Sequence, residues 1–195
     1  MNRPLKIITF GDSLTLGYQT PSPQNPMGKS TPYDRFLKEL LGDAAEVLVQ
    51  GVNGELTAEM VMRLDRDVIS HRPDGVVILG GTNDLGWGAD PQEVMRNLVT
   101  MYERVRSSDI QPIAVTVPSI RGFDRLIPPR QTLNRLITEC CQAKQQPLVD
   151  LFAATAEPET LRLAEPYSND GLHLITEGYR LLAKLLYDEI FKPSV

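Results

Sequence analysis

The sequence predicts an α/β fold of three layers, an α/β/α sandwich in which a five-stranded parallel sheet lies between helices. The first observation behind this prediction is that short, continuous apolar runs recur at fairly even spacing along the 195 residues. The second is that the segment between each run and the next is long enough for a helix. Because strands and helices alternate over the whole chain, we expect right-handed crossovers between parallel strands. With about 150 residues per domain as a guide, residues 1–195 are predicted to form a single domain.

The strands are predicted from runs that are rich in valine and isoleucine and lack polar alternation. Such runs are typical of strands buried on both faces of a parallel sheet. In chain order they are residues 5–10, 46–50, 75–79, 111–117 and 146–151.

The helices are predicted where apolar residues recur at intervals of three and four positions. These segments are residues 31–41, 57–70, 90–107, 129–143 and 176–191. Thr57 and Asp90 are residue types that cap helix N-termini, and Pro91 suits a first helical turn, where its missing N–H costs nothing. Residues 18–33 contain four prolines and are predicted to form a long ordered loop after the first strand.

The composition is that of a folded globular protein and restricts the class of partner. With 42% hydrophobic and 23% charged residues, the chain differs from disordered proteins. Its net charge is −5 and it has no run of lysine or arginine, which argues against nucleic acids and acidic membranes as partners.

The sequence also bears on the compartment. No stretch approaches the ~18 to 20 apolar residues that span a bilayer, so we expect no integral membrane association. Residues 7–10 form too short an apolar run for a signal peptide, so a cytoplasmic protein is expected unless a leader was removed. Cys140 and Cys141 are adjacent in a predicted helix, where their side chains point apart, so no structural disulfide is expected between them.

The loops that follow the strands are the candidate functional segments, because ligands bind outside the carboxyl ends of the strands in an open parallel sheet. The first strand runs into Gly11-Asp12-Ser13-Leu14, which places a serine at this edge beside a glycine that allows a sharp turn. Ser13 is therefore a candidate nucleophile. The alternative is that Ser13 only caps the helix that follows, because serine is a preferred N-cap residue.

A serine hydroxyl is a weak nucleophile at neutral pH and needs a base, most often histidine, within hydrogen-bond reach. The sequence contains two histidines, His71 and His173. His71 lies between a predicted helix and the third strand, which is the amino-terminal edge of the sheet and the wrong side for a site. His173 follows the last strand in Asp170-Gly171-Leu172-His173, where Asp170 can accept the imidazole N–H. We predict His173 as the base and Asp170 as its orienting residue, although such Asp/His pairs are also common as purely structural features.

Acyl transfer also requires hydrogen-bond donors aimed at a developing oxyanion. The loop after the third strand contains Gly80-Gly81-Thr82-Asn83-Asp84, in which the Asn83 amide is a candidate donor. In the loop after the second strand, residues 51–57, Gly54 exposes its N–H without obstruction from a side chain. Gly51, three residues earlier, is an alternative donor, and each loop by itself could be an ordinary glycine-rich turn.

Together these blocks resemble those of the GDSL, or SGNH-hydrolase, family, and they occur in the family's order from Ser13 to His173. The resemblance implies a flavodoxin-like SGNH-hydrolase fold. It implies Ser13 as the nucleophile and as an oxyanion donor through its backbone N–H. It also implies Gly54 as the second N–H donor, Asn83 as the side-chain donor, and Asp170 with His173 as the rest of a catalytic triad.

The resemblance further implies a serine hydrolase that cleaves carboxylic esters through an acyl-enzyme, without a metal or a cofactor. The family acts on short-chain esters, lysophospholipids, acyl thioesters and acetylated sugars, so the expected partner is a small-molecule ester whose identity is left open. The walls of its pocket are expected from residues 18–33, Trp87 and residues 121–129. With one tryptophan, five phenylalanines and six tyrosines, small or medium acyl groups are favoured over a long lipid.

Three other α/β classes compete with this interpretation. A G-x-S-x-G nucleophile elbow is disfavoured because position 15 is threonine, and because Asp170 and His173 share one loop. A receiver domain would need an aspartate after the third strand, where Gly80 stands. A flavodoxin-like module that binds phosphate or FMN at the first loop is the main non-catalytic alternative, but it leaves the Asp170/His173 pair without a purpose.

Overall fold

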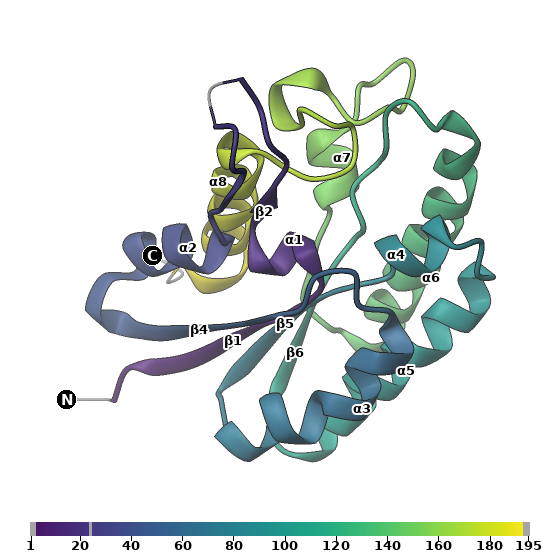
Figure 1. Ribbon diagram of the computed structural model, residues 1–195. Coiled ribbons are helices and arrows are strands. Elements are labelled where there is room, and N and C mark those ends of the chain that lie inside the picture. The colour runs from purple at the N-terminus through teal and green to yellow at the C-terminus, as the bar shows by residue number, and fades with distance from the viewer. Residues whose placement is uncertain (1–2, 24, 193–195) are drawn as a thin grey trace.

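A five-stranded parallel sheet forms the middle layer of the computed structural model, which describes residues 3–23 and 25–192 (Figure 1). Its strands lie in the order β4-β1-β5-β6-β7. Their bounds are β1 (Leu5–Gly11), β4 (Ala45–Gly51), β5 (Gly75–Leu79), β6 (Gln111–Val115) and β7 (Leu148–Val149). All neighbouring pairs are parallel, as predicted.

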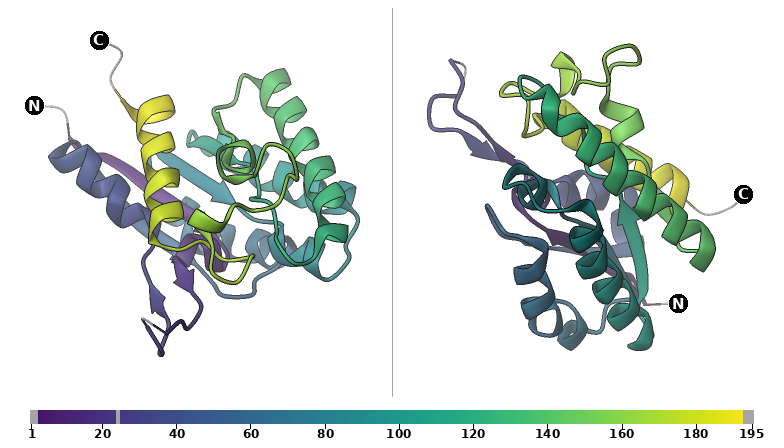
Figure 2. Two further views of the ribbon diagram at one scale, coloured as in Figure 1. Left: turned by 90° about the horizontal axis from the view of Figure 1, so that it is seen from above. Right: turned by 90° about the vertical axis from the view of Figure 1, so that its right-hand side faces the viewer.

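Helices cover the sheet on both faces, which confirms the three-layer α/β/α sandwich (Figures 1 and 2). Two of them pack against each other, α2 (Tyr33–Leu41) and α8 (Thr176–Leu186). The other long helices form a second group in which α5 contacts both of its neighbours: α3 (Thr57–Asp67), α5 (Pro91–Ser107) and α6 (Ile127–Lys144).

The short elements were not predicted, because one turn of helix is too short to show an apolar period. The short helices are α1 (Ser13–Leu16), α4 (Thr82–Gly86) and α7 (Leu151–Thr155). Further single turns are η1 (Gly42–Ala44), η2 (Ile69–His71), η3 (Asp124–Leu126), η4 (Glu165–Tyr167) and η5 (Tyr187–Phe191). Two of these turns lie at the ends of predicted helices. The helix predicted over residues 57–70 is α3 followed by the turn η2, and the helix predicted over residues 176–191 is α8 followed by the π-type turn η5.

The core includes strands β1 and β5, which are neighbours in the sheet. Ile8 and Phe10 of β1 are wholly buried, as is β5 from Val76 to Leu79. In the ladder, Gly11 pairs with Gly51 of β4 on one side and with Leu79 of β5 on the other. The carboxyl ends of these three strands are therefore level, and the loops that follow them emerge at one edge of the sheet.

One predicted helix cap is correct and one is wrong. The Asp90 side chain accepts a hydrogen bond from the Gln92 N–H, and Pro91 occupies the first turn of α5. At α3 the N-cap is Leu56, whose N–H donates to the Glu59 carboxylate. Thr57 is instead the first residue of the helix, and its hydroxyl and N–H both donate to the Asp84 carboxylate.

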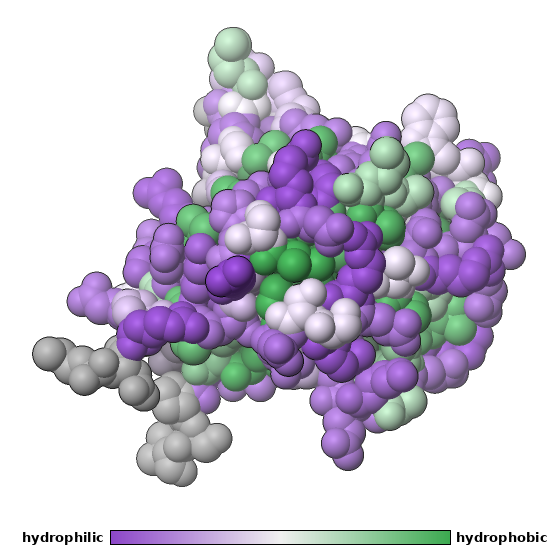
Figure 3. All heavy atoms as spheres, turned by 90° about the horizontal axis from the view of Figure 1, so that it is seen from below, coloured by the Kyte–Doolittle hydropathy of each residue, from purple (hydrophilic) through white to green (hydrophobic). Residues whose placement is uncertain are grey.

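Residues 18–33 are more regular than the predicted loop, since they contain the antiparallel hairpin of β2 (Tyr18–Gln19) and β3 (Lys29–Ser30). This hairpin projects from one side of the molecule (Figure 2). The face seen from below carries mainly hydrophilic side chains with small apolar areas between them (Figure 3). Within residues 3–23 and 25–192, no helix has the length and hydrophobicity needed to cross a bilayer.

Candidate active site

Ser13 is the first residue of α1, directly after β1 at the carboxyl edge of the sheet. The helix is capped by its neighbour: the Asp12 Oδ1 accepts a hydrogen bond of 2.9 Å from the Leu14 N–H. The alternative in which Ser13 serves as the cap is therefore wrong. Within the described residues, the Ser13 hydroxyl and N–H have no hydrogen-bond partner, which leaves both available to a substrate.

The turn after η4 brings Asp170 and His173 into contact. The His173 Nδ1 lies 2.7 Å from the Asp170 Oδ2, while Oδ1 accepts from the N–H groups of Leu172 at 2.9 Å and His173 at 2.8 Å. Burial raises the pKa of Asp170, but the His173 side chain and these N–H donors outweigh burial and lower it to about 2. The carboxylate is thus charged at neutral pH, and we assign the imidazole proton to Nδ1, which leaves Nε2 as a proton acceptor.

The Asp170–His173 turn is held in place by the loop that follows β6. The Arg121 N–H donates to the Gly171 carbonyl at 2.8 Å, and its Nη2 donates to the Ser168 carbonyl at 2.7 Å. Gly171 has φ of +80°, and a Cβ there would lie 2.3 Å from the Arg121 carbonyl oxygen. A glycine is required at this position because any side chain would collide with backbone.

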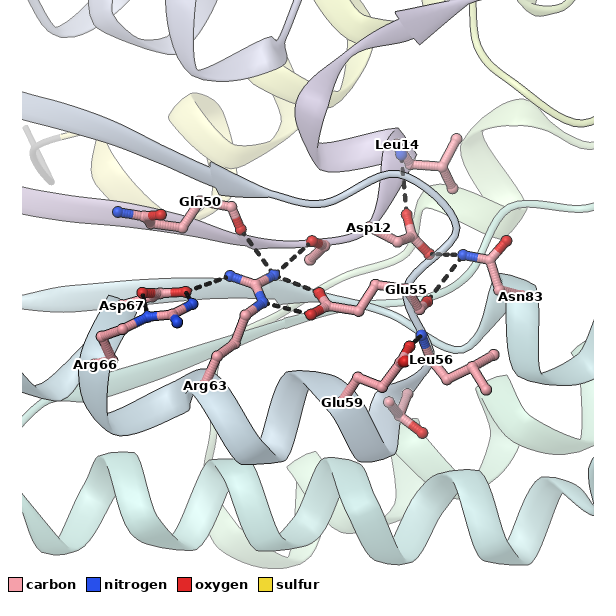
Figure 4. A network of polar contacts seen from close by, with 12 residues as sticks. Asp12, Leu14, Gln50, Glu55, Leu56, Glu59, Arg63, Arg66, Asp67 and Asn83 are labelled. Atoms are coloured by element: carbon pink, nitrogen blue, oxygen red, sulfur yellow. Dashed lines mark hydrogen bonds and ion pairs between the residues drawn. The ribbon is translucent and has the colours of Figure 1, made fainter.

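Asn83 lies in α4, at the carboxyl end of β5, and faces the loop after β4 (Figure 4). Its Nδ2 donates to the Glu55 carbonyl at 2.9 Å and lies 3.5 Å from the Asp12 Oδ2. The amide nitrogen carries two hydrogens. The first fixes the orientation of the side chain, and the second makes only the long contact with Asp12, so a substrate oxygen can compete for it.

The structure separates the two glycines proposed for the loop after β4. Gly54 is exposed and has φ of +74°, and a Cβ added there would meet no other part of the protein within 4 Å. In the part of the chain that the structure describes, nothing accepts its N–H. Gly51 is instead the last residue of β4 and is packed so closely that a Cβ would lie 2.5 Å from the Leu16 nitrogen. These surroundings favour Gly54 over Gly51.

Two buried carboxylates that the sequence interpretation did not use hold this loop. Asp84 accepts from the Thr57 hydroxyl at 2.6 Å and from the Thr57 N–H at 3.1 Å, which joins α4 to the start of α3. Glu55 accepts from Arg63 Nε at 2.6 Å, and the Arg63 Nη2 donates to the Gly11 carbonyl at 3.0 Å (Figure 4). The loop after β4 is thus tied to α4 and to the end of β1.

His71 lies apart from this constellation. It ends the η2 turn at the amino-terminal edge of the sheet, where its side chain is exposed. This placement agrees with the prediction that His71 has no role in the site, so it provides a natural control for His173.

The pattern of the GDSL-like Lipase/Acylhydrolase family matches residues 9–181 of the sequence. The chain belongs to this family. An arylesterase of Vibrio mimicus is 27% identical over 192 residues, which cover 96% of this chain and 88% of the arylesterase. The uncharacterized lipoprotein YqeF of Bacillus subtilis (strain 168) is 29% identical over 123 residues, which cover 60% of this chain and 50% of the lipoprotein. The chain therefore aligns with about half the length of that relative.

A solved structure supports the same assignment. The lipase/acylhydrolase from Enterococcus faecalis superimposes on this member of the GDSL-like family with a TM-score of 0.79. The two sequences are 29% identical, and the superposition covers 95% of each chain.

In this GDSL-like protein a cavity of about 320 Å³ lies beside Asn83. Its lining includes Trp87 on one side and Phe123 and Leu126 on the other, so two of the predicted pocket walls do border one cavity. Residues 18–33 do not line it, but they do line a separate polar cavity, and their Tyr18 ring packs edge-on against His173 at 4.8 Å between centroids. Within the described residues, no cluster of three or more His, Cys, Asp or Glu side chains could hold a metal ion.

Asp12 is wholly buried next to Ser13, and its ionisation should be visible in the stability of the protein. Burial raises its pKa to about 7, although the Leu14 N–H and the charge of His173 act against this rise. Between the unfolded value near 3.8 and about 7, the folded state binds more protons than the unfolded state, so stability falls as pH rises through this window. Asp12→Asn is therefore expected to be more stable than the wild type at pH 8, by on the order of a few kcal/mol.

This expectation is checked by urea unfolding at pH 8 and at pH 4.5. The stability advantage of Asp12→Asn should shrink at the lower pH, where the wild-type carboxyl is protonated in the fold. An equal difference at both pH values would contradict the raised pKa of Asp12.

Proposed function

We propose that this protein is a serine hydrolase that cleaves carboxylic esters through an acyl-enzyme on Ser13. The observation that carries the proposal is the Asp170–His173 pair, in which the 2.7 Å contact commits Nδ1 and leaves Nε2 free as a base. This pair lies at the same edge of the sheet as Ser13, whose hydroxyl has no partner among the described residues, and as the oriented amide of Asn83. Membership of a lipase/acylhydrolase family supports the same reaction class.

In the proposed reaction, the Ser13 Oγ attacks the ester carbonyl carbon while His173 Nε2 takes the hydroxyl proton. The negative charge that develops on the carbonyl oxygen is stabilised by the N–H groups of Ser13 and Gly54 and by the second N–H of Asn83. His173 then gives its proton to the leaving alcohol. A water molecule enters, loses a proton to His173 and releases the acid, which restores Ser13.

Asp170 has a defined part in this cycle. Its carboxylate holds the imidazole in the tautomer that accepts a proton at Nε2, and its charge stabilises the imidazolium that forms after proton transfer. Because its pKa is about 2, Asp170 stays ionised at every pH at which His173 can act as a base. In the described chain no hydrogen bond joins the Ser13 hydroxyl to His173, so the approach of these two groups in the substrate complex is part of the proposal.

The substrate is proposed to be a small-molecule ester with a small or medium acyl group. Two observations support this size. The cavity beside Asn83 has a volume of about 320 Å³, which is at the lower end of ordinary ligand pockets. Its lining includes two exposed aromatic side chains, Trp87 and Phe123, which offer apolar surface for a short acyl chain.

The proposal is tested by labelling with a fluorophosphonate, which phosphonylates an activated serine. Mass spectrometry of a digest should find the adduct on Ser13, with no labelling in Ser13→Ala. Ser70→Ala, which changes an exposed serine of the η2 turn, should be labelled at the wild-type rate. Hydrolysis that persists unchanged in Ser13→Ala would show that Ser13 is not the nucleophile and would overturn the proposed acyl-enzyme.

A further inference from the structure

The cavity beside Asn83 is lined by two arginines that form no ion pair with any residue the structure describes. They are Arg125, in the η3 turn, and Arg130, in α6. None of the described residues that line this cavity is acidic, although the chain as a whole has a net charge of −5. The cavity lining is therefore positively charged, whereas the protein as a whole is negatively charged.

Arg130 is the more unusual of the two, because its side chain is only 1% exposed. Its Nη1 donates to the Leu126 carbonyl at 3.2 Å, but its Nε and Nη2 have no hydrogen-bond partner among the described residues. Burial lowers the pKa of Arg130 to about 10, which still leaves the group charged at neutral pH. A buried cation without a paired anion is costly to the fold, and fixed charges of this kind are characteristic of binding sites.

Arg125 is exposed at the mouth of the same cavity and makes no hydrogen bond or ion pair with any residue that the structure describes. The acid next to it in the chain cannot neutralise it: the Asp124 carboxylate accepts from Arg162 Nε at 2.9 Å. The Arg125 guanidinium is thus free to contact a ligand directly, while the charge of Arg130 acts on the same ligand through a poorly screened, buried environment.

We propose that this cavity binds a carboxylate carried by the substrate, so that the enzyme prefers esters that bear a negative charge over neutral esters of the same size. Arg125 makes the direct contact and Arg130 adds its field, while Trp87 and Phe123 provide the apolar walls. The inference rests on the proposed ester hydrolysis, because it identifies the chemical class of ester that the Ser13 site would take.

Two pairs of probes test the proposal, because the carboxylate could be on either side of the scissile bond. For the acyl side, mono(4-nitrophenyl) glutarate is compared with 4-nitrophenyl valerate, which has a methyl group in place of the carboxylate. For the alcohol side, 4-acetoxybenzoate is compared with 4-acetoxybenzamide. We define the charge preference as kcat/KM for the charged ester divided by kcat/KM for its neutral partner. Comparing the charge preference of the wild type with that of a variant cancels the difference in intrinsic reactivity between the two esters.

Arg125→Gln is expected to lower this charge preference by about tenfold to a hundredfold in at least one pair, as for loss of a hydrogen bond to a charged group. Arg130→Met should also lower it, without lowering the melting temperature, because an unpaired buried charge is replaced by an apolar chain of similar length. Arg135→Gln is the matched control: it removes an exposed arginine of the same helix that pairs with Glu139, and the preference should not change.

An unchanged preference in both Arg125→Gln and Arg130→Met would overturn the proposal. So would a loss of stability in Arg130→Met with equal effects on charged and neutral esters, since that is the signature of a structural role. If no ester is hydrolysed at all, the proposed function fails, and the carboxylate site is then decided by calorimetry. Monomethyl glutarate, which carries one carboxylate, should bind the wild-type protein more tightly than the neutral methyl valerate, and Arg125→Gln should abolish that difference. Equal binding of the two compounds would overturn the site.

Discussion

His173→Ala is expected to lower kcat by about 10⁶-fold, which is the largest effect that a single substitution should have on this protein. The reason is that Ser13 loses the base that is proposed to take its proton and return it to the leaving alcohol. His71→Ala should leave the rate unchanged, because His71 is exposed at the opposite edge of the sheet. The measurement is steady-state hydrolysis of an activated ester by purified variants, with circular dichroism to check the fold.

Asp170→Asn refines this prediction. Asparagine can keep an oxygen acceptor for the N–H groups of Leu172 and His173, so the turn should survive. It cannot accept the Nδ1 proton with its amide nitrogen, so the imidazole should adopt the wrong tautomer, at an expected cost of about 10⁴-fold in kcat. If His71→Ala silenced the enzyme while His173→Ala did not, the triad would be wrongly assigned.

Asn83→Ala is expected to lower kcat by about 10²- to 10³-fold, or about 2.7 to 4 kcal/mol, with little change in KM. The Asn83 amide is held by the Glu55 carbonyl at 2.9 Å, so its second N–H is oriented before the substrate arrives. A donor fixed in this way strengthens its hydrogen bond mainly when charge develops on the carbonyl oxygen. The ground state, and hence KM, gains little from it.

The competing explanation is that Asn83 only ties α4 to the loop after β4. In that case Asn83→Ala would lower the melting temperature, and activity would fall only with the fraction of unfolded protein. Kinetics and thermal melting on the same preparation distinguish the two. Asn97→Ala is the matched control, because the Asn97 amide supports the same region through the Thr57 hydroxyl, at 3.0 Å, and has no part in the oxyanion hole. A folded Asn83→Ala protein with normal kcat would refute the oxyanion role.

The fold class was readable from the sequence, because strand and helix periodicities are local properties. The apolar runs of β1 and β5 coincide with the predicted strands to within one residue, since both strands are buried on both faces. The prediction was poorer for β7, which has two residues and lies at the edge of the sheet, where fewer neighbours extend a strand. Strand order was not predicted, because it depends on which strands pair and not on their composition.

The candidate catalytic residues were named from the sequence, and their roles stay predictions. They occur in short blocks that follow predicted strands, and parallel strands bring such blocks to one edge whatever the details of packing. Spacing alone did not choose between Gly51 and Gly54. The packing of Gly51 against α1 and the open, left-handed conformation of Gly54 were needed to favour one of them.

The sequence by itself thus determined the layers of the fold and named the candidate residues that follow the carboxyl ends of its strands. Only the tertiary structure decided which groups are free to act. It assigned the cap of α1 to Asp12 and not to Ser13, because the carboxylate reaches the Leu14 N–H. It also placed Arg130, far from Asn83 in sequence, beside the same cavity, with two side-chain nitrogens that no described residue hydrogen-bonds. The physical reason is that side-chain hydrogen bonds and unpaired charges depend on contacts between segments distant in sequence, which a local sequence pattern does not predict.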